Sequence, residues 1–290
     1  MKVYLDCIPC FLRQALEAAR WASDDERCQR TVLDTVARLI PGLPLNATPI
    51  DMGREIHRAV REVTGTDDPY REVKKQVNDR ALELYLECQK RVEASADPLF
   101  TALKVAAAGN VIDFATHSIF DLDLSIEECL KDGVRMADYP ALKKRLEDVA
   151  EVLYLGDNAG EIVFDKLVVE QLVKLGRRVT YVVRGGPIIN DVTVDDASYV
   201  GMDEIAQVVS SGSDGPGTTL RWCRAGFIDR FRGAKLIISK GQGNFEGLSD
   251  VKSPIFFLLK VKCPVVAQEL GEELGEIVLR AQKDWKRRAG

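Results

Sequence analysis

The spacing of apolar residues changes near residue 149 and divides the chain into two regions. Before that point, apolar positions recur about every three to four residues, which is typical of amphipathic helices. One such stripe comprises Phe11, Leu12, Ala15, Leu16 and Ala19. We therefore predict an all-helical N-terminal region over residues 1–147, with helices near 10–21, 25–39, 51–63, 68–92, 98–115, 125–132 and 141–149.

From residue 148 to 290, short apolar runs alternate with helical segments. The expected strands lie near 152–155, 179–183, 206–209, 235–239 and 255–260, and the longer helices near 160–175 and 219–231. Strands that alternate with helices predict a parallel sheet with right-handed crossovers. The expected fold class is α/β, in which the helical region packs on a Rossmann-like, three-layer α/β/α domain with a mainly parallel sheet.

Polar side chains follow three of the expected strands at the point where each strand ends. Asp157 and Asn158 follow the first strand, Arg184 and Asp191 the second, and Lys240 the fourth. The carboxyl ends of parallel strands meet at one edge of a sheet, where ligands bind in open α/β folds. Asp157, Asn158 and Asp191 thus predict an all-oxygen site with few protein ligands, which suits Mg²⁺ or Mn²⁺.

The same edge offers groups for a phosphate. The helix that begins after Gly160 presents unpaired backbone N–H groups to an anion. Lys240 would add a point charge, and the glycine-rich loop that begins at Gly241 would add flexible N–H groups. An Asp after a strand also commonly caps a helix, and Arg184 has the alternative of pairing with a surface carboxylate. The prediction therefore depends on all three strand ends together.

Composition excludes several classes of partner. Of 290 residues, 46% are hydrophobic and 29% charged, as in a globular protein with a real core. The net charge of −5 argues against nucleic acid as the main partner. No apolar run approaches the roughly 20 residues that span a bilayer, and Asp6 interrupts the start of the chain, unlike a signal peptide. We expect a cytoplasmic protein without a membrane partner.

Seven cysteines make an odd, scattered set that does not indicate a disulfide framework. Cys7 and Cys10 form a Cys-x-x-Cys pair. A structural zinc site needs four ligands, and the sequence has no second close pair. A thioredoxin-like role requires a strand before the pair, which is absent. We favour a packing role, with metal or redox chemistry as alternatives.

Two cofactor motifs fit poorly. The turn after the first strand superficially resembles the cofactor loop of S-adenosylmethionine methyltransferases, but Asn158 occupies the position of the second glycine and Tyr154 that of an acidic residue. The segment 241–247 nearly matches the dinucleotide fingerprint, but its third glycine comes one residue late and it follows a late strand. A nicotinamide enzyme is therefore disfavoured.

Taken as a set, the motifs resemble the metal-dependent damage-control phosphatase family, formerly family 89 of the domains of unknown function. The similar segments are Leu155-Gly-Asp-Asn-Ala-Gly-Glu161, Arg184-Gly-Gly-Pro-Ile-Ile-Asn-Asp191 and Ser239-Lys-Gly-Gln-Gly-Asn244. Cys7-x-x-Cys10, Asp68-Pro-Tyr70 and Ala108-Gly-Asn-Val-Ile-Asp113 are similar to the compact prokaryotic branch of the family. The resemblance keeps the order of these motifs and covers nearly the whole chain.

The resemblance implies hydrolysis of phosphate esters of small metabolites, such as sugar phosphates, nucleotides or damaged phosphometabolites, with Mn²⁺, Mg²⁺, Co²⁺ or Ni²⁺. The family's metal ligands fall on Asp157, Asn158 and Asp191, and its phosphate-binding lysine falls on Lys240. The further substrate-binding candidates are Asn110, Asp113, Gly160, Glu161, Arg184 and Gly241. We expect water as the nucleophile, with the Asp157 carboxylate as the alternative.

Two other functions are kept as alternatives. The first is an S-adenosylmethionine-dependent protein carboxyl methyltransferase, an activity proposed for a eukaryotic branch of the same family. The second is a phosphometabolite-binding protein in which the same groups bind the ligand without hydrolysing it.

Overall fold

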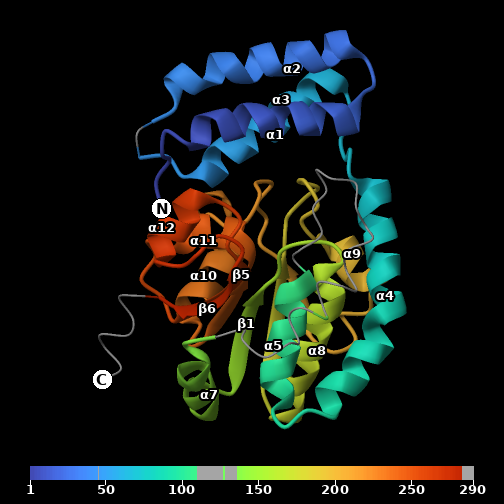
Figure 1. The fold of residues 1–290 in the computed structure, drawn as a ribbon, viewed down its shortest axis with the longest axis vertical. Helices are drawn as coiled ribbons and strands as arrows, with labels where there is room; N and C mark the ends of the chain where they lie inside the picture. The colour runs from blue at the N-terminus through green and yellow to red at the C-terminus, as the bar shows by residue number, and fades with distance from the viewer. Residues whose placement is uncertain (45, 110–126, 128–135, 283–290) are drawn as a thin grey trace.

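A six-stranded sheet forms the centre of the protein (Figure 1). The structure is a computed structural model that describes residues 1–44, 46–109, 127 and 136–282. The strands lie in the order β3-β2-β1-β4-β5-β6, and β6 alone runs antiparallel to its neighbour. They comprise β1 (Glu151–Leu155), β2 (Arg178–Val183), β3 (Gln207–Ser210), β4 (Ile237–Lys240), β5 (Ile255–Lys260) and β6 (Ile277–Ala281). The predicted α/β class with a mainly parallel sheet is confirmed.

Alternating residues of each strand enter two separate cores, because successive strand side chains point to opposite faces. In β1, Val152 and Tyr154 join the core on one face, whereas Leu153 and Leu155 join the core on the other. The first face is covered by α4 (Arg71–Glu93), α5 (Pro98–Ala108), α7 (Tyr139–Glu147), α8 (Glu161–Lys174) and α9 (Val194–Tyr199). The second is covered by α10 (Ala225–Gly233), α11 (Gly241–Leu248) and α12 (Pro264–Leu270). The three expected layers are present.

Three N-terminal helices form a further layer above the sheet (Figure 1). They are α1 (Cys7–Ala22), α2 (Glu26–Leu39) and α3 (Pro49–Thr64), and they enclose a core of their own. The start of α3 is fixed by a capping box between Thr48 and Asp51, and its end by Gly65 in the left-handed conformation. The division of the chain into 1–147 and 148–290 stays a prediction; α4 and α5 share their core with the sheet.

This helical layer lies on the edge of the sheet where the parallel strands end. Arg54 of α3 forms an ion pair with Asp214, with Nε and Oδ1 2.6 Å apart. Asp51 of the same helix accepts a hydrogen bond from Trp222 Nε1 at 3.0 Å. The segment that follows β3 is therefore held between α3 and the sheet.

Several predicted elements differ from the structure. The segment that begins at Gly241 is a helix, not a loop, because β4 passes directly into α11. The helix expected over 219–231 begins only at Ala225, after a short 3₁₀ turn, η4 (Leu220–Trp222). A second 3₁₀ turn, η1 (Ile40–Gly42), follows α2, which ends at Leu39 as the helix predicted over 25–39 does. The sequence reading missed β6 and α12. The helix expected over 125–132 lies almost entirely outside the described residues.

In the part of the chain that the structure covers, no helix is both long and apolar enough to cross a membrane.

Acid should destabilise the fold through His57, which lies buried in α3 with its Nε2 unpartnered among the described residues. Burial, together with nearby Arg61, lowers its pKa to about 3. The unfolded chain then binds this proton near pH 6.5, so stability is present above that pH and is lost as pH falls towards 3. Between pH 6.5 and 5 we expect wild type to lose about 1.6 kcal/mol more unfolding free energy than His57→Gln. Urea titrations at both pH values measure this difference; equal losses would contradict it.

Candidate active site

The candidate site lies where β1 and β4 are neighbours and the chain leaves them on opposite sides of the sheet. The order of the first five strands is that of a doubly wound sheet, whose switch point lies between β1 and β4. Asp157 and Asn158 follow β1, and Gly241 follows β4. The crevice at such a switch point is the usual place for a ligand in this architecture.

The three residues predicted as metal ligands come together at this point. Asn158 and Asp191 face each other in an isolated antiparallel bridge between their loops. The N–H of Val192 donates to the carbonyl oxygen of Asp157 at 2.9 Å, which ties the two loops together. Asn158 Nδ2 donates to Asp157 Oδ2 at 2.8 Å. Two carboxylates and one amide, drawn from two loops that are distant along the chain, therefore share one small space.

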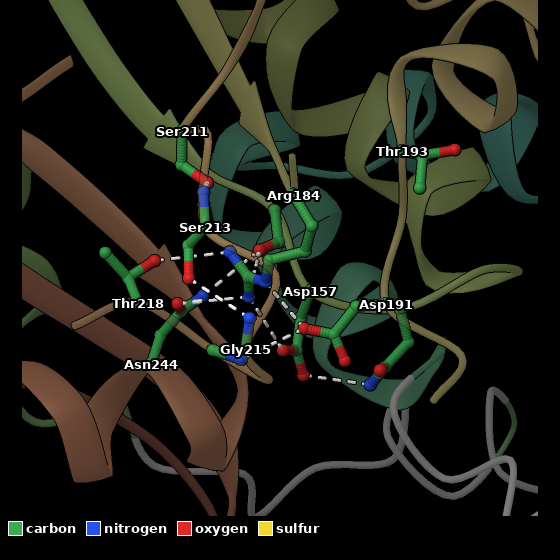
Figure 2. A network of polar contacts seen from close by, with 12 residues as sticks. Asp157, Arg184, Asp191, Thr193, Ser211, Ser213, Gly215, Thr218 and Asn244 are labelled. Atoms are coloured by element: carbon green, nitrogen blue, oxygen red, sulfur yellow. Dashed lines mark hydrogen bonds and ion pairs between the residues drawn. The ribbon is translucent and has the colours of Figure 1, made fainter. Parts of the chain in front are cut away.

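Arg184 lies beside both carboxylates and contacts each of them (Figure 2). Its Nε donates to Asp191 Oδ2 at 2.6 Å, and its Nη2 lies 3.6 Å from Asp157 Oδ1. The remaining donors reach Thr218 Oγ1 and Asn244 Oδ1, both at 3.2 Å. The side chain of Arg184 is fully buried. The alternative of a surface ion pair is therefore wrong, and in this arrangement the guanidinium holds the two carboxylates in place.

The negative charge of the buried Asp157 carboxylate is not fully balanced by the positive groups around it. Burial raises the pKa of Asp157 well above its usual range, and the neighbouring carboxylates of Asp191 and Glu161 raise it further, against a lowering by Arg184. When neighbouring groups do not fully balance the charge of a buried carboxylate, binding of a cation or a proton to it is favourable. The donor set, consisting only of oxygens, fits a hard divalent cation.

Gly241 is in close contact with the Asp157 carboxylate. It has a φ of +78°, and a Cβ added there would lie 1.8 Å from Asp157 Oδ2. This predicted substrate-binding residue therefore shapes the site by having no side chain, which lets the start of α11 approach the carboxylate.

Gly241→Ala should displace Asp157 and lower the phosphatase activity expected from the sequence by more than about tenfold, because a misplacement of about 1 Å is costly in catalysis. Gly243→Ala is the matched control in the same helix, since its Cβ would meet the nearest atom only at 3.4 Å. We expect that control to keep its activity. Steady-state assays of both variants test this, and equal activity in the two would contradict the role given to Gly241.

The ammonium of Lys240 has three hydrogen-bond partners, none of which is a candidate ligand. Its Nζ donates to Glu161 Oε1 at 2.5 Å, to Asp165 Oδ1 at 2.6 Å and to the carbonyl oxygen of Ala106 at 3.1 Å. These contacts use all three N–H groups of the ammonium. Burial opposes its charge, but Asp165 and Glu161 outweigh burial and raise the pKa of Lys240. Contact with a phosphate, which stays a prediction, requires Lys240 to exchange one of these partners.

Glu161 connects Lys240 to the candidate ligands. One carboxylate oxygen accepts from Lys240, and the other, Oε2, accepts from Asn158 Nδ2 at 3.3 Å. The Asn158 amide is thereby fixed from two sides, because the same nitrogen also donates to Asp157. Glu161, predicted to bind substrate, has in this structure the geometry of a residue that orients Asn158.

A buried anchor behind Lys240 was missed by the sequence reading. Asp165 accepts hydrogen bonds from Tyr154 at 2.8 Å and from Tyr181 at 2.7 Å, in addition to Lys240. Both tyrosines lie in central strands and read as ordinary apolar core residues. Their spacing gives no signal that their hydroxyl groups converge on one carboxylate.

The N–H of Gly160, predicted to hold a phosphate oxygen, already has a partner. It donates to Asn78 Oδ1 of α4 at 2.6 Å. Asn78 is buried, and its Nδ2 has no partner among the described residues. The helical region thus reaches the site through Asn78, which the sequence reading did not single out. The predicted residues Asn110 and Asp113 lie outside the described residues.

Other parts of the described chain offer no stronger candidate. Within residues 1–109 and 136–282, residue 45 excepted, no group of three or more His, Cys, Asp or Glu side chains is arranged to hold a metal ion. The candidate set differs from such a group because its third member is the amide of Asn158. A cavity of about 510 Å³ lies at the opposite edge of the sheet, lined by residues such as Glu151, Arg178 and Lys235. Its charged groups lie near the amino ends of β1 and β4, remote from the convergence described above.

Comparisons with known proteins show which family the chain is similar to. The model of the damage-control phosphatase ARMT1-like domain matches residues 3–278. A damage-control phosphatase of Pyrococcus horikoshii is 34% identical, over 98% of this chain and 99% of its own. A damage-control phosphatase of Archaeoglobus fulgidus is 33% identical, over 97% and 99%. The crystal structure of a DUF89 family protein from P. horikoshii superposes with a TM-score of 0.90, at 34% identity, over 98% of this chain and 100% of that one.

Proposed function

Because the chain belongs to the damage-control phosphatase ARMT1-like family, we propose that it is a divalent-metal-dependent phosphatase that hydrolyses phosphate monoesters of small metabolites. The observation that carries the proposal is the convergence of Asp157, Asn158 and Asp191 at the switch point of the sheet. Sugar phosphates, nucleotides and damaged phosphometabolites are the proposed substrate classes.

Asp157, Asn158 and Asp191 are the residues that would hold the metal. Their oxygen donors suit Mn²⁺, Mg²⁺, Co²⁺ or Ni²⁺, and the raised pKa of Asp157, caused by burial and then by Asp191, reflects a deficit of positive charge. When bound, the metal neutralises charge that develops on the phosphoryl oxygens.

The chain's own residues keep these ligands rigid. Arg184 Nε and the N–H of Gly217 both donate to Asp191 Oδ2, at 2.6 and 3.0 Å. Glu161 fixes the Asn158 amide at 3.3 Å. Preorganised ligands need no rearrangement as the reaction proceeds, which is the main source of electrostatic catalysis.

A water molecule is the proposed nucleophile. Asp157 is crowded by Gly241 on one side and by Asn158 on the other, and its oxygens are needed to hold the cation. An attack by this carboxylate on phosphorus would remove it from that role. The phosphate-binding functions proposed for Lys240 and Gly160 require Lys240 to exchange one of its three partners and Gly160 to release Asn78.

Phosphate release by metal-stripped protein tests the proposal. A panel of sugar phosphates and nucleotides is assayed with Mn²⁺, Mg²⁺, Co²⁺ or Ni²⁺ added back singly. We expect release only when metal is restored. Metal-dependent ligand binding without release would instead support a phosphometabolite-binding protein. Stabilisation by S-adenosylmethionine without any phosphate release would support a methyltransferase.

A further inference from the structure

The Cys-x-x-Cys pair lies at the margin of the core of the three-helix layer, where Cys7 packs against that core and Cys10 does not. Cys7 and Cys10 belong to the first turn of α1, where Cys10 is exposed and Cys7 is half-buried. The main core of the three-helix layer is formed instead by residues such as Phe11, Ala15 and Ala18, on the buried stripe of the same helix. The packing role favoured from the sequence therefore accounts poorly for Cys10, and the chemistry of the pair needs another explanation.

The first turn of α1 already brings the two residues to the separation that a disulfide requires. Residues three apart in an α-helix lie on one face, with Cα atoms about 5 Å apart from the helical rise and radius. Disulfides accept Cα separations of about 4.4–6.8 Å. A bond between Cys7 and Cys10 therefore needs side-chain rotation and little movement of the backbone.

The two thiols lie in different surroundings. Arg13 Nη2, one turn further along α1, donates to Cys10 Sγ at 3.8 Å, so the exposed sulfur has a permanent positive charge beside it. Burial raises the pKa of Cys7, and the nearby Glu246 and Cys263 groups add to this effect. An exposed sulfur beside a cationic side chain is the more reactive of two thiols, so Cys10 is the sulfur that reacts first.

We propose that Cys7 and Cys10 form a redox-active dithiol that exchanges with low-molecular-weight disulfides. The Cys10 sulfur attacks the small disulfide and forms a mixed disulfide, releasing one small thiol. The Cys7 sulfur then attacks the Cys10 sulfur, forming the Cys7–Cys10 bond and releasing the second small thiol. The protein loses two electrons and two protons, and the small disulfide gains both. This inference does not depend on the proposed phosphatase function.

A third thiol makes the pairing testable. Cys263 caps the start of α12, where its Sγ accepts from the N–H of Val266 at 3.4 Å. Burial raises the pKa of Cys263, with smaller contributions from neighbours that include Glu246 and Cys10. Cys263 is thus a neighbour of the pair, but it already serves as a helix cap and lacks the one-turn spacing. The proposed bond is therefore Cys7–Cys10.

The test equilibrates the full-length protein with reduced and oxidised glutathione in varied ratios, because oxidised glutathione is a linear disulfide that can release its two thiols one after the other. Free thiols are then alkylated, and the masses of the tryptic peptides are measured by mass spectrometry. The peptide Val3–Arg13 contains Cys7 and Cys10 and no other cysteine. We expect this peptide to lose both labels and two hydrogens as the oxidised reagent increases, and to regain both labels when excess dithiothreitol is added.

Three variants serve as controls. Cys10→Ser should leave Cys7 fully alkylated at every ratio, whereas Cys28→Ser and Cys263→Ser should leave the transition of the Val3–Arg13 peptide unchanged. Thermal unfolding of each variant shows that it is folded. Full labelling of Cys7 and Cys10 in folded wild type under the most oxidising ratio would overturn the proposal. A protected species that disappears in Cys263→Ser would overturn it as well.

Discussion

Asp157→Asn is expected to reduce metal-dependent phosphate release by about a thousandfold, equivalent to about 4 kcal/mol of transition-state stabilisation. The substitution removes one of the two carboxylates that would hold the cation, while the side chain keeps its size. The fold should remain, because burial raises the pKa of Asp157 and its charge is costly where it lies. Phosphate-release kinetics with saturating Mn²⁺ measure the effect, and thermal unfolding reports on the fold.

A matched control is available for Asp157→Asn. Asp195 lies exposed in α9, and Asp195→Asn removes the same charge from a solvated position. It should keep wild-type activity within about twofold, as surface substitutions usually have small effects. If Asp157→Asn retains metal-dependent activity while folded, the assignment of the ligands is wrong.

Lys240→Met should lower the unfolding free energy by about 3–5 kcal/mol, because it leaves the buried carboxylates of Glu161 and Asp165 without their shared cation. Methionine keeps most of the side-chain volume, so the loss reports on charge rather than on a cavity. Urea unfolding followed by circular dichroism measures the change. Lys174→Met is the control, since Lys174 forms an exposed ion pair with Glu93 that is worth less than about 1 kcal/mol.

The two roles considered for Lys240 give different results. If Lys240 serves mainly to contact phosphate, Lys240→Met should be as stable as wild type and lose only activity. The geometry favours a large loss of stability, because Asp165 and Glu161 have 0% exposed side chains. A change below about 1 kcal/mol would contradict the anchoring role.

The sequence reading located the sheet and the candidate ligands because both depend on local signals. A run of β-branched residues such as 179–183 identifies a strand without tertiary information. The residues that follow this strand then lie at the edge of the sheet where the parallel strands end. Asp157 and Asp191 follow from this reasoning. The strand β6 was missed because Ile277–Ala281 ends in the polar and small residues Arg280 and Ala281, and it pairs with β5 only through a long-range antiparallel contact.

The surroundings of the ligands depend on contacts that no local pattern encodes. Arg184 has the same chemistry whether it faces solvent or two buried carboxylates, and only the fold determines that it meets Asp191. Asn78 reaches Gly160 across 82 residues of sequence. Gly241 was interpreted as a flexible loop residue, whereas it begins a helix with a φ of +78° that other residues rarely adopt.

The central claim is that Asp157, Asn158 and Asp191 hold one divalent cation. Electron paramagnetic resonance of free Mn²⁺, titrated into metal-stripped protein, tests it most directly because it needs no substrate. We predict one tightly bound Mn²⁺ per chain in wild type and in Asp195→Asn, and at least about a tenfold weaker binding in Asp157→Asn and in Asp191→Asn. Wild-type protein that binds no Mn²⁺, or variants that bind it as tightly as wild type, would contradict the account.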